Sequence, residues 1–285
     1  MRELHVGEGS LEAALLPEAG ARLHRLRAFG HDLLRTPPDA AAHLREPFFW
    51  GAYVMAPWCN RLPAGATTVN GRPVRLASNF PDGSAIHGQV SAVAWSEGGA
   101  EGQLAVRGGG DGWPWPYEVT AFAEAGDASL LLRWQLTNLA DEPMPAGLGF
   151  HPWWQRPVQL RVAADRVYAS NVSPTTEPEP VRDRYDLRTL APPAEGLDGT
   201  WTAGSPPEIE LAWPELGLRA TITTSSMATY VAVATPADLD AIAVEPQTHA
   251  PDGLRRLLDG RHDGLAVLPA GASLTLDLGI SVRRG

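Results

Sequence analysis

Residues 117–145, YEVTAFAEAGDASLLLRWQLTNLADEPMP, decide the fold class of this chain. The stretch predicts a strand, a turn at Gly126-Asp127, a second strand and then a loop, because β-prone residues alternate with polar ones on both sides of the turn. Two strands joined by such a short turn run antiparallel. The same period of two recurs along most of the chain, which indicates antiparallel β-structure rather than helices.

A second hairpin is predicted at residues 67–76, TTVNGRPVRL. Its Asn70-Gly71 pair lies between two β-prone runs, and this dipeptide suits the two-residue turns of hairpins. Pro73 cannot donate a hydrogen bond to a neighbouring strand, so the second arm is expected at a sheet edge. Further strands are predicted in residues 216–236, which hold two, and in residues 272–284, which close the chain.

Helical periodicity is scarce, and only residues 38–45 and 252–260 are expected to form a turn or two of helix. Residues 173–196 are rich in Pro and Glu and do not alternate. We expect them to form a long surface excursion rather than an interdomain linker, because the strand pattern resumes unchanged after them. The sequence therefore predicts an all-β protein, a large antiparallel β-sandwich or barrel that residues 1–285 form as a single domain.

Charge and cysteine content exclude several classes of protein. The formal net charge of −10 comes from 33 acidic and 23 basic residues without a basic stripe, so we expect no nucleic-acid or membrane partner. Cys59 is the one cysteine, which excludes an intramolecular disulfide and a zinc site made of thiolates. The N-terminal MRELHVGEGS lacks the features of a signal peptide, and no segment approaches the roughly 18 apolar residues of a membrane span. These features predict a cytoplasmic protein and leave its oligomeric state open.

Four segments combine ionisable side chains with turn-like surroundings. They are residues 56–65 with Arg61, 83–90 with His87, 147–154 with His151 and 241–253 with Glu245. Each has a structural alternative, because an isolated arginine is usually a surface charge and a histidine beside aromatic residues usually belongs to the core. Glu245 follows an apolar strand; if it faces inward, desolvation raises its pKa and makes it a usable general base.

Signatures of other chemistries are absent from the sequence. There is no HExxH or CxxC motif and no pair of histidines at strand spacing, so we expect no catalytic metal. A GxSxG nucleophile elbow, a dinucleotide fingerprint and a phosphate-binding loop are also missing. The sequence therefore carries no motif for a catalytic metal, a serine nucleophile, a dinucleotide or a phosphate-binding loop.

Taken in order, the four segments resemble the aldose 1-epimerase (mutarotase) family. The resemblance rests on Pro57, Asn60-Arg61 and Gly65, then HG at 87–88, GFHP at 149–152 and VEPQT at 244–248. The Asn-Gly hairpin, WPYEVTAFAE (115–124), LTN (136–138) and LPAGASLTL (268–276) agree with it. It extends over most of the chain, between residues 10 and 283.

This resemblance implies a large antiparallel β-sandwich of the galactose-mutarotase type with an open groove for a free sugar. Glu245 matches the family's general base, which acts on the anomeric hydroxyl, and His151 matches the general acid, which acts on the ring oxygen. Arg61 and His87 match residues that bind sugar hydroxyls, and Asp198 in GLDGTWTAG matches a sugar-binding aspartate before an aromatic residue. No metal or organic cofactor is implied.

The chemistry of anomer exchange calls for such a pair of groups. Opening the hemiacetal removes a proton from the C1 hydroxyl and delivers one to the ring oxygen, and closure on the other face reverses both transfers. A positioned acid or base contributes roughly 10²–10⁴-fold to such a step. We therefore expect an aldose 1-epimerase that acts on a free aldohexose such as glucose or galactose.

Two alternatives stay open on the same fold: a hexose-6-phosphate mutarotase and a non-catalytic carbohydrate-binding protein. Members of this superfamily that act on phosphorylated hexoses use additional arginines, for which Arg72 and Arg156 are available, although the sequence does not place them at a phosphate. A hydrolase or lyase acting on glycans is a further alternative, and it would need a longer groove.

The ten tryptophans suggest that some stack on a sugar ring. Trp58, Trp153 and Trp201 are the candidates. Relatives often have a single Tyr or Phe where this chain has Trp153-Trp154, so these two line either the groove or the core.

Overall fold

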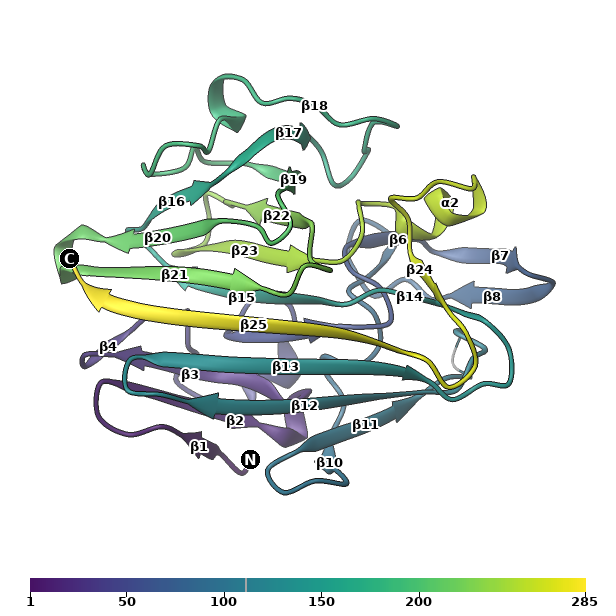
Figure 1. The fold of residues 1–285 in the computed structure, drawn as a ribbon, viewed down its shortest axis with the longest axis horizontal. Helices are drawn as coiled ribbons and strands as arrows, with labels where there is room; N and C mark the ends of the chain where they lie inside the picture. Colours follow the sequence, from purple (N-terminus) through teal and green to yellow (C-terminus); the bar gives the residue numbers. More distant parts are fainter. Residues whose placement is uncertain (111) are drawn as a thin grey trace.

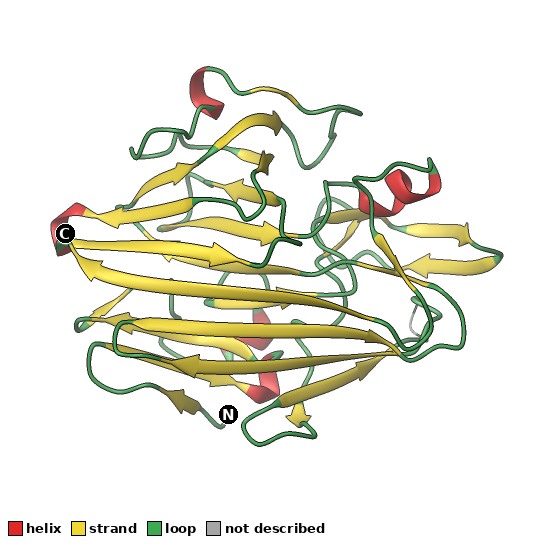
Figure 2. Cartoon of the chain, in the orientation of Figure 1, coloured by secondary structure: helices red, strands yellow, loops and turns green. Residues whose placement is uncertain are grey.

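Two large antiparallel sheets packed face to face make up most of the molecule (Figure 1; Figure 2). The computed structural model describes residues 1–110 and 112–285. The first sheet has eleven strands. In spatial order they are β1 (Leu4–Val6), β2 (Leu11–Leu16), β3 (Arg22–Ala28), β5 (Ala52–Met55), β15 (Gly149–Gln155), β23 (Ala241–Gln247), β22 (Tyr230–Ala234), β19 (Asp198–Ala203), β17 (Ala164–Tyr168) and β18 (Glu179–Pro180), with β4 (His31–Asp32) beside β3.

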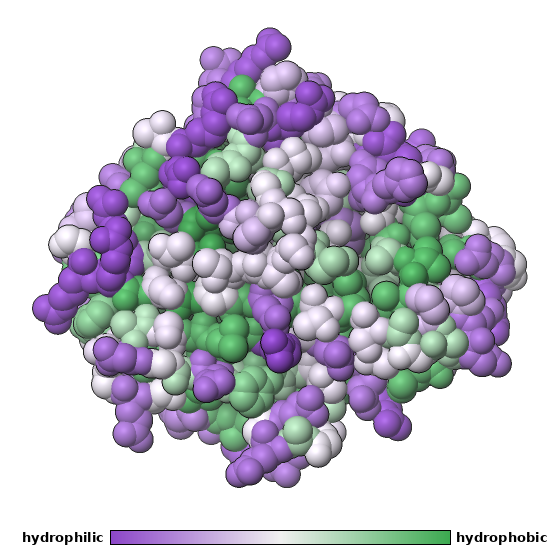
Figure 3. Space-filling view, viewed as in Figure 1, coloured by the Kyte–Doolittle hydropathy of each residue, from purple (hydrophilic) through white to green (hydrophobic). Residues whose placement is uncertain are grey.

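The second sheet has eight strands, and its β12–β13–β25–β21 centre crosses the front of Figure 1. In spatial order they are β10 (Ser96–Glu97), β11 (Leu104–Gly108), β12 (Tyr117–Ala125), β13 (Ser129–Asn138), β25 (Ser273–Arg284), β21 (Leu218–Thr224), β20 (Ile209–Trp213) and β16 (Gln159–Val162). Three two-stranded sheets complete the strands: β6 (Arg61–Pro63) with β9 (Ser84–Ile86), β7 (Gly65–Val69) with β8 (Arg72–Leu76), and β14 (Met144–Ala146) with β24 (Ala266–Leu268). The structure therefore confirms the predicted all-β antiparallel sandwich. On the face viewed in Figure 3, apolar and polar residues are interspersed.

Both predicted hairpins are confirmed. β12 and β13 pair from Tyr117 opposite Asn138 to Ala125 opposite Leu130. β7 and β8 form a sheet of their own, so the arm that holds Pro73 is an edge strand. The strand that closes the chain is β25, between β13 and β21.

The two strands predicted in residues 216–236 exist, but they belong to different sheets. β21 pairs with β20 and β25 in the second sheet, whereas β22 pairs with β19 and β23 in the first. The chain therefore crosses from one sheet to the other between them.

Helices are short and lie within the two predicted stretches. They are α1 (Ala42–Arg45) and α2 (Gly253–Leu258). Three 3-10 turns lie elsewhere in the chain: η1 (Pro17–Ala19), η2 (Asp183–Tyr185) and η3 (Pro214–Leu216). No helix among the described residues is long and apolar enough to cross a membrane. Residues 173–196 follow β17 and include β18, which pairs with β17 at the edge of the first sheet, before the chain re-enters this sheet at β19 on the other side of β17. That path is a surface excursion, as predicted.

The core lies between the two sheets, and strand alternation decides which side chains enter it. On β15, Phe150 points into the core and packs against Trp134 of the second sheet, with ring centroids 4.7 Å apart. Successive side chains of a strand point to opposite faces. His151 and Trp153 therefore face away from this core, whereas Trp154 faces into it.

Candidate active site

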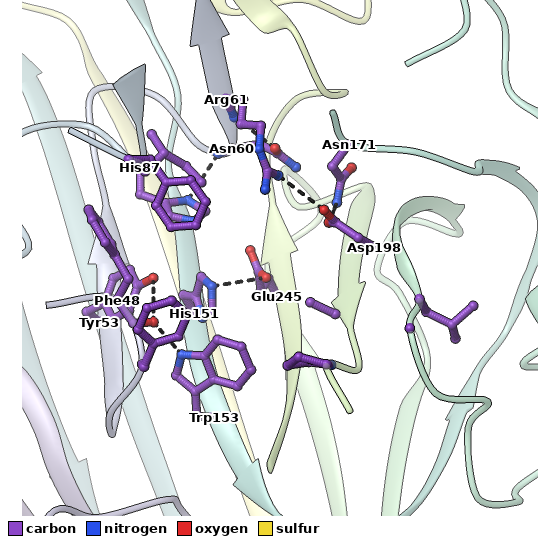
Figure 4. A pocket seen from close by; sticks show the side chains of 17 residues that line it. Phe48, Tyr53, Asn60, Arg61, His87, His151, Trp153, Asn171, Asp198 and Glu245 are labelled. Atoms are coloured by element: carbon purple, nitrogen blue, oxygen red, sulfur yellow. Dashed lines mark hydrogen bonds and ion pairs between the residues drawn. The ribbon is translucent and has the colours of Figure 1, made fainter. Parts of the chain in front are cut away.

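A cavity of about 290 Å³ lies on the face of the first sheet that points away from the core (Figure 4). Its size is near the lower end of the range for small-molecule pockets, roughly 300–1,000 Å³. One group of lining residues is aromatic: Phe48, Phe49, Tyr53, Phe80 and Trp153. A second group is polar: Asn60, Arg61, His87, His151, Asn171, Asp198 and Glu245. The cavity thus brings together all five residues singled out in the sequence, from five separate parts of the chain.

His151 and Glu245 meet because β15 and β23 are neighbouring strands that present both side chains on the same face. Nε2 of His151 lies 3.2 Å from Oε1 of Glu245. Both residues are only 4 % exposed. Oε2 of Glu245 and Nδ1 of His151 have no hydrogen-bond partner. Each residue of the pair thus keeps one polar atom whose hydrogen-bonding capacity the protein itself does not use.

Burial shifts the proton equilibria of this pair in opposite directions. Desolvation, and then the charge of Asp198, raise the pKa of Glu245 to about 8, while Arg61 opposes the shift. Desolvation lowers the pKa of His151 to about 3, and Arg22 and Arg61 add to the shift. Around neutral pH the pair therefore carries no net charge and shares one transferable proton, so it titrates as a unit.

His87 is held in a defined tautomer by the backbone. Its Nδ1 accepts a hydrogen bond from the backbone N–H of Asn60 at 3.2 Å, which leaves the ring proton on Nε2. Desolvation, followed by His151 and Arg61, keeps the pKa of His87 well below its usual value. The ring is therefore a neutral hydrogen-bond donor.

The same tautomer bears on whether the site could hold a metal. Ligand atoms of His87, His151 and Glu245 lie within 4.8 Å of one another. A metal-bound imidazole nitrogen must be unprotonated. Because the Asn60 amide occupies Nδ1 of His87, the remaining nitrogen carries the proton, and the cluster suits hydrogen bonding and proton transfer better than metal coordination.

Arg61 is fixed between two carboxylates at the polar side of the cavity. Its Nε lies 2.7 Å from Oδ2 of Asp82, and its Nη1 lies 3.3 Å from Oδ2 of Asp198. Asn171 donates from Nδ2 to the other oxygen of Asp198 at 2.8 Å, and Thr200 donates to Oδ1 of Asn171 at 2.7 Å. This network orients Arg61 and Asp198 before any ligand arrives.

Sequence reasoning missed Asn171, Asp82 and most of the aromatic wall of the cavity, which consists of Phe48, Phe49, Tyr53, Phe80 and Trp153. Asn171 lies in a loop without a motif, and nothing in the sequence pairs it with Asp198. Phe48 and Phe49 follow a short helix, and apolar residues at such a position are usually part of the hydrophobic core. Only the folded chain brings these residues to the cavity.

The tryptophans divide between the cavity and the core. Trp153 lines the cavity and donates from Nε1 to the backbone oxygen of Phe48 at 2.6 Å. Trp154 is fully buried against Trp213. Trp58 and Trp201 are also core residues and do not line the cavity, so the expectation that either stacks on a ligand there is wrong.

His249, the second histidine of its segment, has a structural role. Its Nε2 accepts from the backbone N–H of Cys59 at 3.0 Å, and Nδ1 donates to the oxygen of Ala250 at 2.7 Å. Both ring nitrogens are satisfied inside the protein.

Five buried histidines predict a marked loss of stability in acid. Desolvation lowers the pKa of each of them below the value of the unfolded chain: His24, His43, His87, His151 and His249. Below about pH 6.5 the unfolded chain binds protons that the folded chain cannot, at about 1.4 kcal/mol per pH unit for each histidine. Glu245 acts in the opposite sense between about pH 8 and 4.5, but it is one group against five.

We expect the free energy of unfolding in urea to fall by on the order of 5 kcal/mol between pH 7 and pH 5. Tryptophan fluorescence measures the transition at each pH. An unchanged free energy of unfolding at pH 5 would show that the histidines are charged in the folded protein.

The family model described as "Aldose 1-epimerase" matches residues 3–278. The fold is similar to that of a candidate aldose 1-epimerase from Escherichia coli K12 (TM-score 0.83, 19 % identity, 100 % of this chain and 99 % of that one). It is also similar to a galactose mutarotase-like protein from Clostridium acetobutylicum (0.84, 16 %, 99 % and 95 %) and to galactose 1-epimerase from Lactobacillus acidophilus NCFM (0.79, 15 %, 99 % and 94 %). No curated protein sequence matches the chain. At these identities, the structural likeness shows the fold alone.

Proposed function

The chain belongs to the aldose 1-epimerase family, and from this premise we propose that it interconverts the α and β anomers of a free aldohexose such as glucose or galactose. The observation that carries the proposal is the His151–Glu245 pair, which shares one proton at the wall of a sugar-sized cavity. Mutarotation needs one group that removes a proton and one that supplies a proton, and no net change in protonation.

In the proposed reaction, Glu245 removes the proton of the C1 hydroxyl while His151 protonates the ring oxygen. The C1–O bond of the ring breaks and C1 becomes an aldehyde carbon. Rotation about C1–C2 presents the other carbonyl face. On closure Glu245 gives its proton back to the C1 oxygen, while His151 takes a proton from the hydroxyl that becomes the ring oxygen again. Because the pair starts and ends with the same shared proton, no water or co-reactant is consumed.

The remaining polar groups suit the non-reacting hydroxyls. Nε2–H of His87 and the guanidinium of Arg61 are donors, and the carboxylate of Asp198 is an acceptor. On the other side, the aromatic wall offers apolar surface to the C–H faces of the ring.

The charges around Arg61 favour an unphosphorylated sugar over a hexose 6-phosphate. Among the residues that the structure describes, Arg61 is the one arginine that lines the cavity, and Asp82 and Asp198 already neutralise it. Arg72 is paired with Glu142, and Arg156 donates to the backbone oxygens of Ala241 and Pro236. A phosphate dianion would therefore meet more negative than positive charge.

A polarimetric panel tests the proposal. Fresh α-glucose, α-galactose, other aldoses and hexose 6-phosphates are each followed to rotational equilibrium with and without the protein. We expect faster drift for at least one free aldohexose and little change for its 6-phosphate. No acceleration with any sugar would leave a sugar-binding protein as the better account, whereas a preference for the phosphate would favour the hexose-6-phosphate alternative.

Substitution of Thr200 is expected to weaken substrate binding, although this residue is fully buried. Thr200→Val removes the hydroxyl that orients Asn171, which in turn holds Asp198. An unpaired buried acceptor costs about 1–3 kcal/mol, so the amide is expected to turn and Asp198 to lose its donor. We expect KM to rise about fivefold or more, with kcat within about twofold of the wild type.

Thr200→Ser keeps the hydroxyl and serves as the matched control, with KM near the wild-type value. Steady-state polarimetry measures both constants. Equal KM values for the valine and serine variants would show that the Thr200–Asn171 contact does not orient Asp198.

A further inference from the structure

Arg22, on β3, is a fully buried cation without a counter-ion. Its guanidinium donates to the backbone oxygens of Trp50 at 3.1 Å and Ser91 at 2.9 Å, and its Nε has no partner. Among the described residues, no carboxylate lies within ion-pair distance of it. Burying an unpaired charge is costly, so its position calls for a reason beyond packing.

The neighbours of Arg22 solvate its charge without neutralising it. Nη1 of Arg22 lies 3.4 Å from Nδ1 of His43, which can only accept from a guanidinium. The proton of His43 is then on Nε2, from which it is donated to Nδ1 of His24 at 2.9 Å. Both histidines are buried and have lowered pKa values, so their rings are neutral. Unlike a carboxylate, a neutral ring does not cancel the positive charge of Arg22.

One aromatic ring connects this charge to the catalytic pair. The guanidinium carbon of Arg22 lies 4.6 Å from the centre of the Tyr53 ring. The same ring stacks on the imidazole of His151, with centroids 4.6 Å apart and planes at 22°. The cation–π contact anchors Tyr53, and Tyr53 in turn limits how the imidazole can tilt.

We propose that Arg22 is a positioning residue of the active site, which acts through Tyr53 by holding the ring against His151 and by keeping an unneutralised positive charge behind the imidazole. Its catalytic consequence rests on the proposed function. A fixed positive charge disfavours the imidazolium, so the protonated His151 becomes a stronger acid toward the ring oxygen of the sugar.

The other charged groups around His151 do not replace this effect. Glu245 on β23 contacts its Nε2, the neutral ring of His87 meets it edge-on at 4.9 Å, and Arg61 on β6 contributes positive charge from the polar side. Arg61, however, is paired with Asp82 and Asp198, whereas Arg22 has no such partner.

A titration of the sugar-free protein tests the proposal independently of turnover. In protein labelled with ¹⁵N-histidine, the His151 signals report the step near pH 8 at which the pair loses its shared proton. Arg22→Met removes the charge and keeps an unbranched apolar side chain, and is expected to move this step up by about one pH unit. Arg22→Lys keeps the charge and is expected to move it much less.

Arg256 provides a matched control because it is another buried arginine, whose guanidinium is bound by Asp263. Arg256→Met is expected to lower stability and leave the His151 step in place. The proposal is overturned if Arg22→Met titrates like the wild type, or if Arg22→Lys shifts the step as far as Arg22→Met does.

Kinetics supply a second test that also covers the case in which Arg22→Met does not fold. Tyr53→Leu removes the connecting ring, whereas Tyr53→Phe keeps it. We expect kcat to fall about tenfold more for the leucine variant, with a smaller change in KM. Equal kcat values for both variants would overturn the role of the ring. If no sugar is turned over at all, the proposed function fails, and the NMR titration alone decides the role of Arg22.

Discussion

Glu245→Gln is expected to lower kcat for mutarotation at least about a hundredfold. Glutamine has nearly the same size and can still contact His151, but its amide cannot take the proton of the C1 hydroxyl. The buried carboxyl has a pKa raised to about 8, which matches its proton affinity to a reaction that runs near neutral pH. Polarimetry at saturating sugar measures the loss.

Sugar binding is the control for this variant. Trp153 lines the cavity, so its fluorescence should change on sugar binding in both the wild type and Glu245→Gln. Near-normal turnover by Glu245→Gln would exclude Glu245 as the base. Loss of both binding and turnover would point to a collapsed cavity instead.

His151→Asn is expected to lower kcat by at least about a hundredfold as well, because asparagine retains a polar side chain but cannot deliver a proton to the ring oxygen. The two groups share one proton across a 3.2 Å contact and act as a unit. The double variant should therefore be only slightly slower than either single variant, rather than slower by the product of both losses.

The double variant separates two accounts of the pair. If the losses multiply, His151 and Glu245 contribute independently and do not exchange a shared proton. If His151→Asn alone keeps near-normal kcat, another donor protonates the ring oxygen.

Alternation along single strands could be read from the sequence, whereas the choice of partner strand could not. The pattern in residues 117–145 predicted β12 and β13 because a hairpin is a local structure. β21 and β22 were equally visible as strands, yet they join different sheets. Side-chain periodicity shows which face a residue occupies but carries no information on the neighbouring strand.

The candidate site was predictable only in part, for the same reason. The contact between His151 and Glu245 depends on β15 lying beside β23, and the spacing of the two residues in the chain does not reveal it. Through a family resemblance, the order of four motifs singled out Arg61, His87, His151 and Glu245. The same resemblance added Asp198, which also lines the cavity. Because Phe150 faces the core, alternation along β15 places Trp154 in the core as well, but the sequence does not show which way Phe150 faces.

Asn171 and Arg22 had no signal in the sequence. Asn171 is an ordinary loop residue until β19 brings Asp198 beside it. Arg22 lies in RLHRLRA, where an arginine in an alternating strand is typical of a surface position, but it is fully buried. Long-range packing alone assigns such residues their roles.

Magnetisation exchange between the α and β anomeric protons of an equilibrated aldohexose tests the central claim most directly, because it measures the interconversion itself. We predict that the wild-type protein raises the exchange rate of glucose or galactose well above the rate in buffer, and that Glu245→Gln at the same concentration does not. A wild-type protein that binds these sugars and leaves their exchange at the buffer rate would contradict the account.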